Sequence, residues 1–174
     1  MDNIFWTIAA ILWTACGVVT IGASVVAHRS SRARYIGRAA VGVLFVIGGA
    51  LVHVINLAAG GDYTTFADPA HFDWVTNTWR DVVGPNQVLF IGLLAAFEAA
   101  VGVLAVSGRR RTQLGYAGVV AFYLALWLFG WFETVWVIVM IPPMLLLLRA
   151  ERRAPTGFAP DVTVGQKPRA HVGS

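Results

Sequence analysis

The stretch LGYAGVVAFYLALWLFGWFETVWVIVMIPPMLLLL, residues 114–148, is almost continuously apolar. A helix crosses the hydrocarbon core of a bilayer, about 30 Å thick, with roughly 20 residues. At 1.5 Å per residue this run would be about 50 Å long, too long for a single crossing. The chain must therefore turn back inside the run, and Gly130 and Glu133 predict the corner. The two resulting spans are 114–129 and 131–148, and Pro142 and Pro143 should kink the second.

Three more apolar spans precede this run, at residues 5–27, 39–59 and 87–106. The whole chain of 174 residues is 57% hydrophobic and 13% charged, whereas an ordinary soluble domain has about 25% charged residues. The sequence therefore predicts an all-α fold, a polytopic membrane helix bundle with five transmembrane helices.

Positive charge is segregated along these spans. Arginines cluster in three places, namely residues 29–38, residues 109–111 and residues 149–153. With five spans all three clusters fall on one side, and the loop at 60–86 falls on the other with four aspartates against one arginine. The positive-inside rule then predicts that the N-terminus lies outside and the C-terminus in the cytoplasm, and the expected location is the plasma membrane. The arginines read as topology signals, so no nucleic-acid partner is expected.

The outer loop, residues 60–86, is too long to be a simple connection. Asp68 followed by Pro69 predicts the start of a short amphipathic helix, with the aspartate as N-cap. Gly84 and Pro85 should end that helix. The expected organisation is an N-terminal helix and basic loop (1–37), a four-helix core (38–149) and a disordered cytoplasmic tail (150–174).

Glu98 is the polar residue most out of place, because it lies near the middle of its span. An ionised carboxylate in hydrocarbon costs several kcal/mol, so the group must be neutral, paired or facing a polar cavity. His53 is the candidate partner, with Gly49 and Asn56 on its helical face. Glu98 should lie about 8 Å deeper than His53. Long side chains or one water would bridge that gap.

Two interpretations of this pair stay open. In one, Glu98, His53 and Asn56 form a site that relays a proton or anchors a polar ligand head group. In the other, a protonated Glu98 only hydrogen-bonds across helices and holds the bundle together.

The sequence has no residue pattern typical of a disulfide, a haem site or a metal site. Cys16 is the only cysteine, which excludes an intramolecular disulfide or dithiol centre. His53 is the only histidine inside a span, so a bis-histidine haem is not expected. Metal binding by His53 and Glu98, with His71, has no diagnostic spacing, and no metal or other cofactor is indicated.

Two segments resemble the DoxX-like family of small membrane proteins. They are RAAVGVLFVIGGALVHVI, residues 38–55, and FEAAVGVLAVSGRRRTQLGYAG, residues 97–118, separated by a long outer loop with an aromatic helix. The resemblance covers about residues 38–149 and implies a four-helix core to which the first span is an addition. It places Glu98 on the family's glutamate and Gly102 and Gly108 on its following glycines. It also implies links to redox complexes and quinones.

These observations leave three functions open. The first is a non-catalytic subunit or small-lipid or quinone-binding module of a membrane complex, with other membrane subunits or a second copy of the chain as partners besides the bilayer. The second is a small proton-coupled transporter that uses Glu98. The third is a quinone- or lipid-modifying membrane enzyme, although the available side chains do not predict such turnover.

Overall fold

The computed structural model describes residues 3–154, and this part of the chain consists of helices and turns without strands. The prediction of an all-α fold is confirmed. The long helices are α1 (Asn3–Val26), α2 (Ser31–Phe45), α5 (Gln87–Val106), α6 (Arg109–Leu126) and α7 (Trp131–Arg153). A π-helical turn, Val46–Leu51, joins α2 to the shorter α3 (Val52–Ala58).

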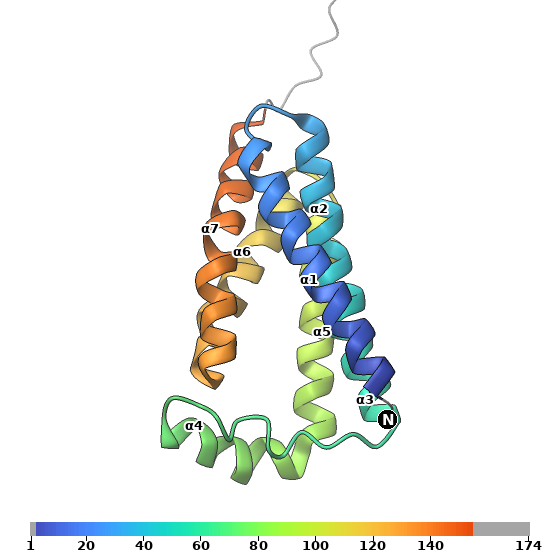
Figure 1. Ribbon diagram of the computed structural model, residues 1–174, viewed down its shortest axis with the longest axis vertical. Coiled ribbons are helices and arrows are strands. Elements are labelled where there is room, and N and C mark those ends of the chain that lie inside the picture. Colours follow the sequence, from blue (N-terminus) through green and yellow to red (C-terminus); the bar gives the residue numbers. More distant parts are fainter. Residues whose placement is uncertain (1–2, 155–174) are drawn as a thin grey trace, which may run out of the picture.

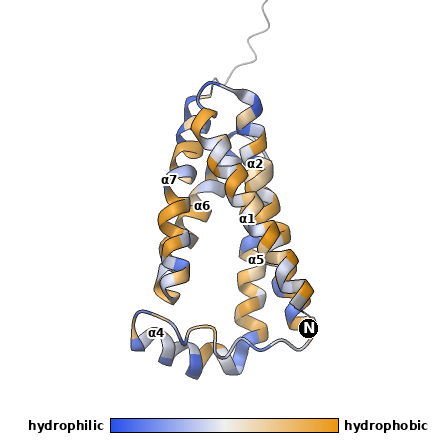
Figure 2. Cartoon of the chain, in the orientation of Figure 1, coloured by the Kyte–Doolittle hydropathy of each residue, from blue (hydrophilic) through white to orange (hydrophobic). Residues whose placement is uncertain are grey.

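Five helices within residues 3–154 are long and apolar enough to cross a membrane, as predicted. They run over Trp6–Val26, Ser31–Ala58, Asp73–Val106, Arg109–Phe129 and Trp131–Arg153. Apolar residues dominate the middle of each helix, while polar residues gather at the two ends of the bundle (Figure 2). We call these the N-terminal end, where α1 begins and α4 lies, and the arginine end, where the α1–α2 and α5–α6 turns lie (Figure 1).

The helices form a ring in which each packs against its neighbours: α1 contacts α2 and α7, α2 contacts α5, and α6 contacts both α5 and α7. Glycines allow close approach at several crossings. A Cβ on Gly115 of α6 would lie 2.6 Å from the backbone nitrogen of Ala105 on α5. A Cβ on Gly42 of α2 would lie 3.4 Å from the carbonyl oxygen of Gly102. The core inside the ring includes the fully buried Tyr116, Met140 and Leu147.

A buried ion pair closes the arginine end. The Arg38 guanidinium of α2 donates from Nε to Oε1 of Glu151 at 2.8 Å and from Nη2 to Oε2. The Glu151 side chain is 1% exposed. Glu151 belongs to residues 150–153, which we expected in the disordered tail but which continue α7 to Arg153. Ala154 is the last described residue, and the rest of that predicted tail, 155–174, lies outside the described part of the chain.

The segment between α3 and α5 differs from the expectation. A helix starts at Asp73 rather than at Pro69, with Phe72 in the N-cap position. Asp68 is not the N-cap, because its carboxylate accepts a hydrogen bond from Arg80 at 3.1 Å and residues 64–69 form turns. The helix α4 (Asp73–Thr78) continues into a π-helical turn (Trp79–Val83).

Gly84 and Pro85 do not end the helical segment either. They form a 3-10 turn, Gly84–Asn86, that leads directly into α5. Pro85 has no backbone N–H to donate to the preceding turn, and this accounts for a change of direction here rather than a straight helix. As a result α4 lies across the N-terminal end of the bundle, beneath α7 and α5 (Figure 1).

The α7 helix runs without a break through both prolines that we expected to kink it. Pro143 is buried and Pro142 is exposed. The corner before α7 lies where the sequence predicts it, because Gly130 has a φ of 145° and separates α7 from the short 3-10 turn Trp127–Phe129.

Candidate functional site

Glu98 points into the interior of the bundle from the middle of α5. Its side chain is 6% exposed, and it lies against Gly49 in the π-helical turn. A Cβ on Gly49 would lie 2.7 Å from Oε2 and 2.8 Å from Oε1 of the carboxyl group. Oε2 is buried and has no hydrogen-bond partner among the described residues. Position 49 therefore provides the space in which the Glu98 carboxyl group sits.

His53 lies next to this carboxyl group. The distance from His53 Nε2 to Glu98 Oε2 is 3.5 Å, so the side chains span the predicted difference in depth directly. The π-helical turn ends at Leu51, two residues before His53. Such turns add a residue to the helix and often occur at functional sites. The separation permits an electrostatic contact, although Oε2 lacks an aligned hydrogen bond.

Tyr63 extends the pair toward the N-terminal end. Its hydroxyl group lies 2.9 Å from Nδ1 of His53, and its backbone N–H donates to Oε1 of Gln87 at 3.0 Å. Burial raises the pKa of the Tyr63 phenol, hydrogen bonding to Asn56 lowers it, and the charge of Glu98 raises it. The imidazole ring of His53 is thus held between a phenol and a carboxyl group.

Asn56 takes part in the site through Tyr63. It is buried at the end of α3, and its side-chain amide fills the space over Gly61, where a Cβ would lie 2.3 Å from Oδ1. The chain turns sharply at this point, since the N–H of Gly61 donates to the carbonyl oxygen of Asn56 at 2.8 Å. Asn56 therefore helps to place the loop that carries Tyr63.

A small cavity adjoins Glu98, and His53 is not among the residues that line it. Its walls include Trp13, Phe45, Phe122 and Tyr123, from three different helices. The centre of a water molecule can occupy about 10 Å³ of this space, and a single water needs roughly 10–15 Å³ on that measure. The cavity is therefore sized for about one water and is too small for a lipid head group.

The loop that covers the N-terminal end is held in place at two points, and we call it the aromatic strap. We define the strap as residues 61–83. On one side Tyr63 binds His53 and Gln87. On the other side, the backbone N–H of His71 donates to the carbonyl oxygen of Leu128 at 3.0 Å. The ring nitrogen Nε2 of His71 lies 2.8 Å from Oγ1 of Thr134.

His71 is therefore committed to the α6–α7 corner and does not join His53 and Glu98. Within the described residues no group of three or more histidine, cysteine, aspartate or glutamate side chains could hold a metal ion. Of the residues proposed from the sequence, the structure brings Glu98 and His53 together and links Asn56 to them through the loop.

Sequence reasoning missed Tyr63 and Tyr123. A tyrosine that follows Asn56 and two consecutive glycines is a weak signal, because only the sharp turn at Gly61 brings Tyr63 back over His53. Tyr123 is 1% exposed and lies in an aromatic span where one more tyrosine does not stand out.

Together these features define an all-α membrane protein with a carboxyl–imidazole–phenol chain in its interior. No family model matches the chain, and neither curated proteins nor solved structures provide a match. The resemblance to DoxX-like proteins therefore stays a prediction from the two quoted segments.

Proposed function

We propose that this protein is a small proton-coupled transporter of the plasma membrane in which Glu98 binds and releases the proton. The observation that carries the proposal is the chain of three titratable groups, from Tyr63 through His53 to Glu98, with contacts of 2.9 and 3.5 Å. An imidazole can accept a proton on one ring nitrogen while it releases one from the other. The chain thus connects the N-terminal end with the middle of the bundle.

The environment of Glu98 favours proton exchange over a purely structural role. A carboxyl group that only holds helices together would be expected to donate or accept an interhelical hydrogen bond. Here Oε2 has no such partner within the described residues, and space for about one water lies beside the group. Among the packed elements, the titratable groups facing Glu98 are His53 from α3, Tyr123 from α6 and Tyr63 from the strap.

The size of the cavity also distinguishes the candidate functions. A quinone or lipid head group anchored by Glu98 needs far more room than the cavity offers, because ligand pockets are typically about 300–1,000 Å³. Proton transfer needs only a water or a neighbouring side chain. The roles of complex subunit and lipid-modifying enzyme have no comparable support from the geometry.

Charge supports an orientation with the N-terminus outside. The arginine clusters at residues 29–38, 109–111 and 149–153 gather at the arginine end, which the positive-inside rule would place in the cytoplasm. Glu98 would then exchange its proton with the outside through His53 and Tyr63. The Arg38–Glu151 ion pair and the apolar core separate it from the cytoplasm in this conformation, so release of the proton to the cytoplasm requires the bundle to open at the arginine end.

The test is solute-dependent proton movement into proteoliposomes. Purified protein is reconstituted with an entrapped pH dye, and a panel of sugars, amino acids, carboxylates and amines is added outside under an inward proton gradient. We expect at least one solute to acidify the lumen with the wild type and none with Glu98→Gln. Glu133→Gln is the matched control, since Glu133 also has a buried Oε2 without a partner in the described chain but lies outside the site. Equal proton movement with wild type and Glu98→Gln would overturn the proposal.

A further inference from the structure

A second concave region lies away from Glu98, on the face of α5 that is turned toward α6 and α7. It is lined by residues 84–89 together with Gly92 and Leu93, and its volume is about 780 Å³. It is a broad, open hollow rather than an enclosed pocket, because all the residues that line it come from one segment, 84–93. We call it the α5 recess.

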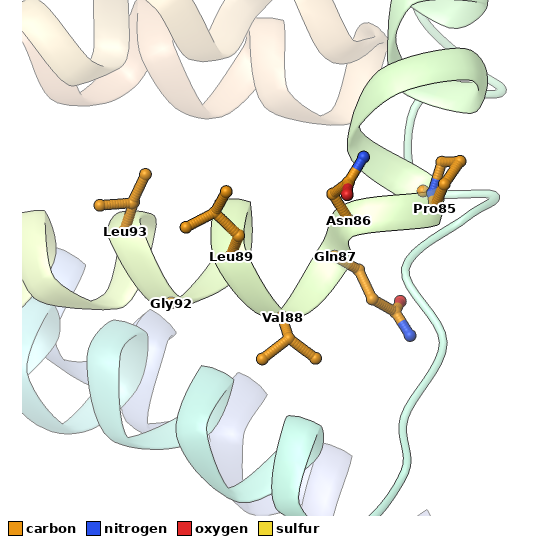
Figure 3. Close-up of a pocket in the computed structure, with 8 residues that line it drawn as sticks. Pro85, Asn86, Gln87, Val88, Leu89, Gly92 and Leu93 are labelled. Carbon is orange, nitrogen blue, oxygen red and sulfur yellow. The ribbon is translucent and has the colours of Figure 1, made fainter.

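The recess is polar at its rim and apolar further in. Asn86, Leu89 and Leu93 point to the same side of the helix, toward the helices drawn in pale orange, while Gln87 and Val88 point away (Figure 3). Leu89 and Leu93 are 59% and 60% exposed, so no other helix within residues 3–154 covers them. A molecule that fills the recess must therefore present polar atoms near Asn86 and hydrocarbon along the two leucines.

Two other parts of the chain lie beyond the ends of the recess. Toward the middle of the bundle, Phe97 of α5 meets Phe122 of α6 with ring centroids 6.1 Å apart. At the N-terminal end, α4 and the π-helical turn after it lead through the 3-10 turn into the start of α5 (Figure 1). The helical residues 87–93 of the recess extend over about 10 Å at 1.5 Å per residue, which is long enough for part of an acyl chain.

The charge near the rim selects among head groups. The strap carries Asp62, Asp68, Asp73 and Asp81 against a single arginine, Arg80. Arg80 already binds Asp68 at 3.1 Å. The remaining negative charge, with Asp81 only three residues before Gly84, repels an anionic head group and attracts an ammonium group.

We propose that the α5 recess binds one zwitterionic phospholipid with an amine-bearing head group. The ammonium group lies near the aspartates of the strap, and an acyl chain lies along Leu89 and Leu93. The lipid covers the face of α5 at Leu89 and Leu93 that the described chain leaves exposed. This site does not depend on proton exchange at Glu98.

Gly92 provides a direct way to fill the recess. A Cβ on Gly92 would meet no atom within 4 Å, and the same is true of Gly22 on α1. Gly92→Trp therefore places an indole in the recess without displacing the helix, and Gly92→Leu fills it less completely. Gly22→Trp is the matched control on another membrane-facing helix.

The experiment uses the full chain reconstituted in vesicles of equal parts phosphatidylethanolamine and phosphatidylglycerol, then gently extracted for native mass spectrometry. We expect the wild type and Gly22→Trp to retain one phosphatidylethanolamine in several-fold preference to phosphatidylglycerol. Gly92→Trp should lose that lipid and Gly92→Leu should retain less of it, with thermal unfolding confirming that all variants are folded. Equal retention by wild type and both Gly92 variants, or a preference for phosphatidylglycerol, would overturn the proposal. Neither result bears on proton movement through Glu98→Gln, so the two proposals fail independently.

Discussion

Gly49 and Glu98 are in direct van der Waals contact, and the absence of a side chain on Gly49 is what admits the carboxyl group. A Cβ at position 49 would lie 2.7 Å from both Cδ and Oε2 of Glu98. Gly49 lies within the π-helical turn Val46–Leu51, so the local geometry of this helix and the position of the acid are linked. His53 follows on the same segment and faces the same carboxyl group at 3.5 Å.

Gly49→Ala should therefore displace the Glu98 carboxyl group and destabilise the bundle. Overpacking of a tight interior typically costs about 1–3 kcal/mol, and we expect a loss in this range in the free energy of unfolding. Thermal or denaturant unfolding in detergent micelles measures it. Gly22→Ala is the control, because a Cβ there meets nothing within 4 Å. If both variants unfold like the wild type, the contact between position 49 and Glu98 is not as tight as described.

Breaking the Arg38–Glu151 ion pair should destabilise the arginine end strongly. Removing one partner of a buried pair costs about 3–5 kcal/mol, because the other charge stays buried without compensation. We expect Arg38→Leu and Glu151→Leu each to lower the unfolding temperature more than the double variant does. A double-mutant cycle by thermal unfolding measures this coupling. Additive losses would show that the two side chains do not depend on each other.

Tyr63→Phe should change the stability of the protein at high pH. Because burial is the main cause that raises the pKa of this phenol above its usual value of 10.0, the unfolded chain releases the proton at a lower pH than the folded one. Stability is then fully present below pH 10 and falls as the pH rises through the higher, folded pKa.

The measurement is the unfolding temperature of wild type and Tyr63→Phe at a series of pH values from neutral to strongly alkaline. The difference between them should be constant below about pH 10, near 1 kcal/mol for the lost hydrogen bond to His53, and should shrink above it. A difference that stays constant at all pH values would contradict the buried position of the phenol.

Thr134→Val should loosen the strap at the α6–α7 corner. The variant removes the hydroxyl group that lies 2.8 Å from Nε2 of His71, while the β-branched shape of the side chain is kept. We expect faster hydrogen exchange of backbone amides at residues 68–72 and a small loss of stability, about 1 kcal/mol. Asn77→Ala, a change at an exposed position of α4, should leave exchange at 68–72 unchanged. Equal exchange in Thr134→Val and wild type would mean that this contact does not hold the strap.

The lengths of the apolar runs were sufficient to predict the five membrane helices, because a bilayer fixes how many helical residues one crossing needs. The same reasoning singled out Glu98, and helical periodicity placed Gly49, His53 and Asn56 on one face. These inferences need only local geometry, and the structure does bring Glu98 and His53 together.

The features that the sequence did not reveal depend on contacts between distant segments. Tyr63 joins the site because the turn at Gly61 folds the loop back over His53. Glu151 looked like one more charged residue in a basic tail, yet Arg38, 113 positions earlier, binds it. The predicted N-cap at Asp68 was wrong because Arg80 takes its carboxylate and the helix starts at Asp73 instead.

The most direct test of the central claim is pH-difference infrared spectroscopy of the reconstituted protein. Glu98 should give a protonated-carboxyl band that appears and disappears reversibly with external pH and is missing in Glu98→Gln. The band should also shift in position or midpoint in His53→Gln, since His53 Nε2 faces this carboxyl group at 3.5 Å. A spectrum in which Glu98→Gln removes no titrating carboxyl band would contradict proton exchange at Glu98.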